Sequence, residues 1–111
     1  MDVRHLSFRL LQVYVQVVRL ASVSAAARLL HLTQPTVSLQ LKKLADRIKQ
    51  LRIEKGYTSY EYFAYDHNIP RAQYGRYEKG EDLKFSSLLK ILKGLDISLK
   101  ELFDEGFTEE T

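Results

Sequence analysis

Residues 22–44, SVSAAARLLHLTQPTVSLQLKKL, decide the fold of this chain. Ala26 and Ala27 carry no bulk, so another helix can cross closely over the first part of the segment. Thr33 is a suitable N-cap for a following helix, because its hydroxyl can accept a hydrogen bond from the first turn. Pro35 fits that first turn, where its missing N–H removes no helical hydrogen bond. The segment therefore predicts two short helices joined by a tight turn.

The second of these helices has one apolar side and one polar side. Val37, Leu41 and Leu44 recur at spacings of four and three residues, which predicts that they are buried together. Further packing is expected from Leu29, Leu30 and Leu32. The polar side offers amides, hydroxyls and amines, the groups that suit base edges and phosphates. These residues are Gln34, Thr36, Ser38, Gln40, Lys42 and Lys43.

The pattern S-x-S-x-A-A-x-x-L-H-L-T-Q-P-x-V-S-x-Q-L-x-x-L over residues 22–44 resembles the N-terminal helix-turn-helix of LysR-type transcriptional regulators. The resemblance implies dimeric binding to promoter DNA, with bases read by Gln34, Thr36, Ser38 and Gln40 and phosphates held by Lys42 and Lys43. Leu39 departs from the family pattern, in which a basic residue is common. After Leu44 the pattern stops, without the wing, long dimerising helix and effector-binding domain of that family. The alternative interpretation is a helical hairpin that only packs.

Residues 4–20 allow two interpretations. The run VYVQVV has the composition of a strand. Helical spacing relates Leu11, Tyr14, Val15 and Val18. We therefore predict a helix. A second stripe of Leu6, Leu10, Val13 and Val17 makes this helix apolar on nearly all sides, so one face is left for another subunit or for the second half of the chain.

A different pattern begins at Asp46 and continues to Phe103. Ser98 with Glu101, and Thr58 with Glu61, fit capping boxes at the starts of helices. Asn68 lies where a turn needs a left-handed residue. An apolar helix that closes the core is predicted from Phe85, Leu88, Leu89, Ile91, Leu92 and Leu95. The whole stretch resembles the Cro/repressor-type (XRE-like) helix-turn-helix domain.

In this second unit, Pro70 is expected to start the recognition helix, RAQYGRYEKG, which ends at Gly80. Tyr74 and Tyr77 are predicted to face inward. The predicted base readers, all facing outward, are Arg71, Gln73 and Arg76. An arginine fork on guanine discriminates by about 1–3 kcal/mol, although plain surface charge is the alternative for both arginines.

Three other residues of the second unit have an expected role. Ser59 and Tyr60 begin the preceding helix, where backbone N–H groups can hold a phosphate. Gly75 lies inside the recognition helix at a cost of about 1 kcal/mol relative to alanine. It either permits close approach to a groove or reflects lax selection.

The two units meet without a linker. There is no Gly or Pro between Thr36 and Lys55, and one apolar stripe crosses the junction at Leu44, Ile48 and Leu51. We therefore predict an all-α fold of two small helix-turn-helix units that share one continuous helix across residues 34–55. The alternative is a break at Asp46, as the N-cap of a new helix.

The predicted divisions are residues 1–45 for the LysR-like unit, 46–103 for the Cro/repressor-like domain and 104–111 for an acidic tail. So abrupt a junction is also typical of an engineered or recombined fusion.

Charge is unevenly distributed along the 111 residues. Residues 1–45 hold six Lys and Arg against one acid, and residues 46–93 hold ten against seven. Residues 94–111 hold one against six. Two basic blocks followed by an acidic end favour a partner with phosphates.

The composition also argues against several kinds of chemistry and against a membrane span. Cysteine is absent, which excludes disulfides and thiolate chemistry, and the histidines have no ligand spacing, so we expect no metal and no cofactor. The most apolar stretch, residues 10–20, is too short to cross a bilayer. The expected location is a prokaryotic cytoplasm, with the nucleoid.

These patterns together predict a non-catalytic, sequence-specific regulator that binds double-stranded DNA. One short helix reads only a few base pairs, so we expect a homodimer, formed through the spare face of residues 6–17. The alternative is an adaptor or antitoxin-like module that uses the same fold to bind a protein, which the tyrosines Tyr60, Tyr62 and Tyr65 suggest. An enzyme is disfavoured, because no nucleophile–base pair or phosphate loop is visible.

Overall fold

The structure is a computed structural model that describes residues 3–81 and 84–104. Within them the chain is all α-helical, which confirms the predicted fold class. The helices are α1 (Val3–Leu20), α2 (Val23–Leu30), α3 (Gln34–Glu54), α4 (Tyr60–Asp66), α5 (Arg71–Glu78), α6 (Phe85–Leu95) and α7 (Leu99–Asp104). The strand alternative for residues 4–20 is therefore wrong. No helix in these ranges has both the length and the apolar character of a membrane span.

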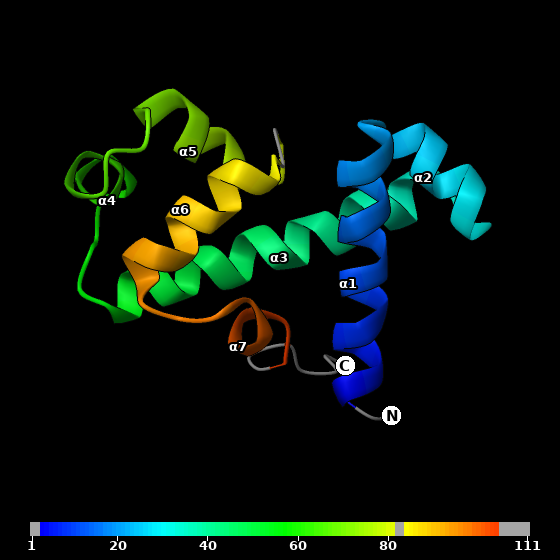
Figure 1. The fold of residues 1–111 in the computed structure, drawn as a ribbon, viewed down its shortest axis with the longest axis horizontal. Helices are drawn as coiled ribbons and strands as arrows, with labels where there is room; N and C mark the ends of the chain where they lie inside the picture. Colours follow the sequence, from blue (N-terminus) through cyan, green and yellow to red (C-terminus); the bar gives the residue numbers. More distant parts are fainter. Residues whose placement is uncertain (1–2, 82–83, 105–111) are drawn as a thin grey trace.

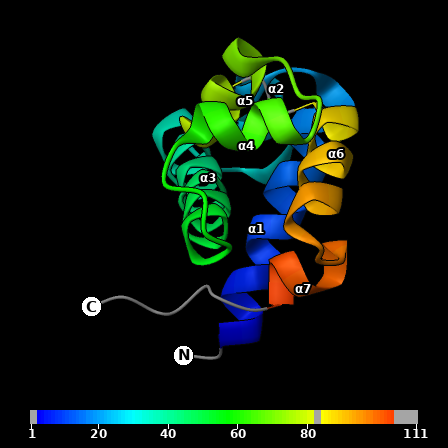
Figure 2. The same ribbon diagram turned by 90° about the vertical axis from the view of Figure 1, so that its left-hand side faces the viewer.

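The predicted continuous helix is α3, which runs unbroken through 21 residues. At the usual helical rise its length is about 31 Å. No break occurs at Asp46, whose carboxylate instead accepts a hydrogen bond from the Lys42 ammonium at 2.6 Å within the helix. α1 and α2 lie at the beginning of α3, and α4, α5 and α6 lie toward its other end (Figure 1). Figure 2, seen along α3, shows α6 and α7 on the side of the molecule opposite this helix.

One hydrophobic core serves both units. The α3 stripe of Val37, Leu41, Leu44 and Ile48 is buried in a cluster that also contains residues of α1, α5, α6 and α7. A hydrogen bond of 2.9 Å joins the hydroxyls of Tyr14 on α1 and Tyr77 on α5. Burial raises the pKa of the Tyr14 phenol, and the bond to Tyr77 opposes this rise only in part. The two units are therefore held together by apolar packing and by one neutral buried hydrogen bond.

The structure corrects the predicted roles of the two α1 stripes. Leu10, Val13 and Val17 are buried in the chain's own core, so they cannot form a spare face. The Leu6 side chain lies outside the described part of the chain. The outward side of α1 carries Val15, which is 45% exposed, whereas Tyr14 of the same predicted stripe is 2% exposed and belongs to the core. The helical period identified the apolar positions but could not say which of them face the core.

Three other leucine and phenylalanine predictions are wrong. Leu29 on α2 is 49% exposed, and Phe85 and Leu89 on α6 are 41% and 49% exposed. Leu89 directly follows the buried Leu88, so composition alone does not reveal its outward direction. The remaining predicted residues of α6 are buried, namely Leu88, Ile91, Leu92 and Leu95.

Two predicted features of the helix ends are present, and the predicted cap of α4 is displaced by one residue. Asn68 has the expected left-handed conformation, with φ of 57°. Ser98 and Glu101 form the predicted capping box, with reciprocal hydrogen bonds of 2.9 and 3.0 Å. The box predicted for Thr58 and Glu61 is wrong, because the cap of α4 is Ser59, whose hydroxyl accepts from the Tyr62 N–H at 3.4 Å.

A buried ion pair fixes α5 against the end of α3. Arg52 Nε donates to Glu78 Oε2 at 2.7 Å, Arg52 Nη2 donates to Oε1 at 3.2 Å, and Arg52 Nη1 donates to the Tyr57 carbonyl at 2.6 Å. The two side chains are 4% and 9% exposed. Burial lowers the pKa of Arg52, but Glu78 outweighs this effect and raises it. Glu78 therefore has a structural role as the buried partner of Arg52.

We expect Arg52→Ala to lower the free energy of unfolding by about 3–5 kcal/mol, because the Glu78 carboxylate would be left buried without its partner. Urea unfolding followed by circular dichroism measures this. The matched control is Arg71→Ala, which removes an exposed arginine paired with Glu61 and should cost under about 1 kcal/mol. Equal losses in the two variants would contradict the role given to Arg52.

Candidate nucleic-acid interface

The first helix-turn-helix is built as the sequence predicted. The Ser22 hydroxyl caps α2 by accepting from the Ala25 N–H at 3.0 Å, and His31 turns the chain in a left-handed conformation. Thr33 caps α3 by accepting from the Thr36 N–H at 3.2 Å. Ala26 and Ala27 are buried, as their small size allows. These local interactions set the start of α3 and the direction of its first polar side chains.

The predicted readers of the first unit do not share one side of α3. Gln34, Ser38 and Lys42 follow one another at intervals of four residues, so they lie in one row. Thr36, Gln40 and Lys43 lie around the helix from that row. The Thr36 hydroxyl accepts a hydrogen bond from Thr33 at 2.8 Å, and Gln40 is half-buried. The structure therefore brings together only half of the predicted set.

The second unit contacts the α3 backbone at the end of that row, next to Lys42. Gly80, just after α5, has φ of +80° and lies against the α3 backbone. A Cβ placed there would be 3.6 Å from the Leu41 carbonyl oxygen and from the Lys42 nitrogen. Lys42 is also engaged with Asp46 through an exposed ion pair. Leu39, the departure from the LysR-like pattern, is 58% exposed.

The second helix-turn-helix consists of α4 and α5. Tyr74 and Tyr77 are fully buried, as predicted, and Arg71 and Arg76 are exposed. Burial, together with the nearby Glu78 carboxylate, raises the pKa of the Tyr74 phenol, so Tyr74 stays neutral. The tyrosines therefore anchor α5 while its two arginines face outward.

Gln73 is the exception among the predicted outward residues of α5. It is half-buried, and its Nε2 donates to the Ser87 hydroxyl of α6 at 2.6 Å. Ser87 is itself only 3% exposed. The prediction that Gln73 faces outward is wrong, because a helix wheel cannot show that α6 supplies a partner there.

The two residues predicted at the start of α4 have other contacts. The Ser59 hydroxyl is occupied as the cap of that helix. The Tyr60 ring lies over α5, with its centroid 6.5 Å from that of Tyr74. A Cβ on Gly75 would lie 3.1 Å from Tyr60 Cε2, so the glycine makes room for this ring. This contact adds an explanation for Gly75 that the sequence did not offer, and close approach to a groove stays a prediction.

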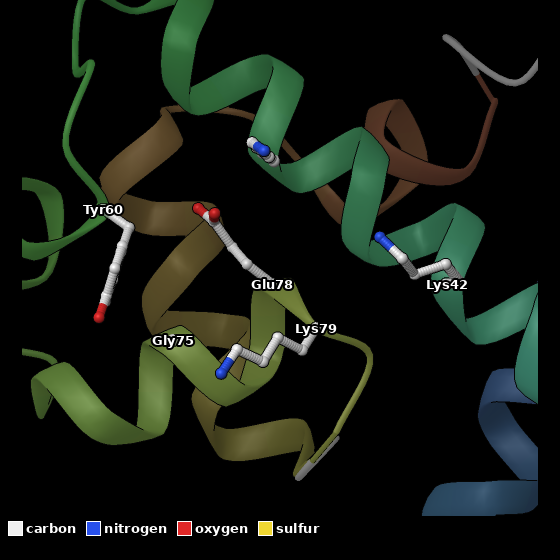
Figure 3. A pocket seen from close by; sticks show the side chains of 6 residues that line it. Lys42, Tyr60, Gly75, Glu78 and Lys79 are labelled. Atoms are coloured by element: carbon white, nitrogen blue, oxygen red, sulfur yellow. The ribbon is translucent and has the colours of Figure 1, made fainter.

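A hollow of about 330 Å³ lies between α3 and α5. Its lining residues are Lys42, Lys49, Tyr60, Gly75, Glu78 and Lys79. In Figure 3, Lys42 on α3 and Lys79 after α5 lie on different sides of the hollow, and Tyr60 forms a further wall. The sequence prediction missed Lys49 and Lys79. Lys49 follows Lys42 by seven residues, a helical repeat that could have indicated it.

Comparison with known proteins finds the two kinds of helix-turn-helix unit that the sequence resembles. The family described as "Bacterial regulatory helix-turn-helix protein, lysR family" matches residues 8–51. The family described as "Helix-turn-helix" matches residues 48–102. The HTH-type transcriptional regulator CfxR of Cupriavidus necator is 46% identical over 52 residues, which cover 47% of this chain but 16% of that protein. The chain thus spans less than a fifth of this relative's length. No match was found among solved structures.

We expect Gly75→Ala to stabilise the protein by much less than the usual helical gain of about 1 kcal/mol, because the added Cβ would press on Tyr60. In a Tyr60→Ala background the same substitution should give the full gain. A double-mutant cycle of urea unfolding measures the difference. Equal gains in both backgrounds would mean that Tyr60 does not require the glycine.

Proposed function

We propose that this chain, which joins a lysR-type helix-turn-helix unit to a second helix-turn-helix unit, binds double-stranded DNA sequence-specifically as a non-catalytic transcriptional regulator. The observation that carries the proposal is the outward position of Arg71 and Arg76 on α5, above two fully buried tyrosines. A helix anchored in this way can present guanidinium groups to guanine O6 and N7. The resemblance would place the protein with the nucleoid of a prokaryotic cytoplasm.

The second unit carries the larger share of base reading in this proposal. Arg71 has only an exposed ion pair with Glu61, at 3.4 Å, which a guanine could readily replace. In the first unit, Gln34 and Ser38 are exposed and form the remaining reading row. Leu39 offers no charge beside that row, so the first unit contributes less to affinity.

The proposed regulator acts as a homodimer, because a single short helix reads only a few base pairs. An apolar groove of about 250 Å³ lies between α1, α6 and α7. Its walls include Leu11, Val15, Val18, Phe85, Leu99 and Phe103. Exposed apolar surface of this kind commonly marks an interaction site, and we assign it to a second copy of the chain. This groove replaces the face of residues 6–17 proposed from the sequence.

A second candidate function is an adaptor that binds a protein partner. The observation that favours it is the exposure of Tyr62 and Tyr65 on α4, at 68% and 81%. Phosphate contacts release counterions, so duplex binding weakens steeply as salt rises. Partner binding through tyrosines would depend little on salt and would occur without duplex affinity.

Selection from a random duplex pool tests the assignment of readers. We expect the intact chain to select a defined motif and Arg71→Ala with Arg76→Ala to lose preference at the guanine positions, at about 1–3 kcal/mol for each bidentate pair. Gln34→Ala with Ser38→Ala should change the motif less. Lys90→Ala with Lys93→Ala on exposed positions of α6 is the charge-matched control. An unchanged motif in the Arg71 and Arg76 variant would refute these base readers.

Sedimentation equilibrium tests the homodimer. We expect Val15→Lys to shift the protein toward monomer by at least tenfold in dissociation constant, because a charge would enter the apolar groove. Leu29→Lys is the matched control, since Leu29 has similar exposure, 49% against 45%, and does not line the groove. The groove assignment fails if both variants associate like the intact chain.

A further inference from the structure

The reading row of the first unit continues along α3 into the second unit. Gln34, Ser38, Lys42 and Lys49 are separated by four, four and seven residues, so they lie on the same side of one unbroken helix. The first two are the outward polar groups at the beginning of α3. The last two line the hollow beneath α5. One side of α3 therefore connects the two units.

The hollow at the end of this row is suited to an anion. Three amines line it, from Lys42, Lys49 and Lys79. Its carboxylate, Glu78, is neutralised by the bidentate contact with Arg52. Among the described residues, neither Lys49 nor Lys79 has an ion-pair partner, whereas Lys42 is shared with Asp46. Two amines are thus available, and the third is engaged by one exposed carboxylate.

The shape of the hollow is also suited to an anion. Gly75 contributes no side chain, and Tyr60 stands at the edge with 37% of its surface exposed. Gly75 on α5 and Lys79 at its C-cap both line the hollow and lie four residues apart, so they share one flank of α5. Arg71, four residues before Gly75, continues that flank toward the start of α5. A nucleic-acid strand beside α5 would therefore pass over the hollow.

We propose that the hollow formed by Lys42, Lys49, Tyr60 and Lys79 binds a phosphate of the DNA backbone and makes one continuous contact surface of the two helix-turn-helix units. This assignment rests on the duplex binding proposed above. The lysines hold the strand without reading its sequence, so they add affinity and set the register in which α5 meets the bases.

The test is the salt dependence of duplex binding. We expect Lys49→Gln with Lys79→Gln to lower affinity uniformly across duplex sequences and to reduce the slope of log K against log salt by about one, the value for the loss of one phosphate contact. Lys90→Gln with Lys93→Gln removes the same charge from exposed positions of α6 and should leave the slope nearly unchanged. Equal slopes in the two variants would overturn the proposal.

A gain-of-function variant tests the same site in the opposite direction. Asp46→Asn should release Lys42 and strengthen duplex binding, and its control is Glu54→Gln on an exposed position of the same helix. Equal effects of these two variants would show a change in overall charge only and would count against the site. Thermal melting checks that each variant remains folded.

Two further outcomes separate the possible failures. An intact chain that binds no duplex at any salt concentration would overturn both the proposed function and this site. Duplex binding with an unchanged slope in the Lys49 and Lys79 variant would overturn the site alone. Titration with inorganic phosphate, followed by amide chemical shifts around Lys49 and Lys79, tests whether the hollow binds a free anion instead of a DNA phosphate. Saturation below millimolar phosphate, with the duplex slope unaffected, would assign the hollow to a small molecule instead of DNA.

Discussion

The unbroken course of α3 is the constraint on which the rest of the structure depends. This helix is the second helix of the first helix-turn-helix unit and the first helix of the second unit, and the two family matches overlap within it at residues 48–51. A linker would let the units reorient, whereas a helix fixes both their separation and their relative rotation. Each added residue would turn the second unit by about 100° and move it by about 1.5 Å. The spacing of the polar row along α3 is therefore a property of the fold.

Sharing a helix forces a shared core, and two polar interactions make its packing specific. Apolar packing along Val37, Leu41, Leu44 and Ile48 supplies burial but little direction. The Tyr14–Tyr77 hydrogen bond and the Arg52–Glu78 pair supply direction, because each buried polar group would be costly without its partner. Both interactions position α5, the helix that carries the proposed base readers.

The parts of this arrangement that the sequence predicted are those governed by periodicity and by local caps. The continuous helix, the buried stripe of α3, the left-handed Asn68 and the Ser98–Glu101 box each depend on neighbours within a few residues. The errors involve distant partners. Ser87 holds Gln73, Tyr60 occupies the space above Gly75, and Leu10, Val13 and Val17 of α1 face the core, all because of helices other than their own. A pattern read along one helix contains no information about what packs against it.

The same dependence on distant partners explains why the sequence did not predict the lysine hollow. Lys42 and Lys43 looked equivalent as neighbours in sequence, but a step of one residue turns the side chain by about 100° around the helix. Lys42 therefore joins Lys49 on the side facing α5, and Lys43 does not. Lys79 lies at the hollow next to Gly80, which brings the end of α5 onto the α3 backbone. Three lysines are thus gathered where the two units meet, at the place where either unit alone would have an incomplete surface.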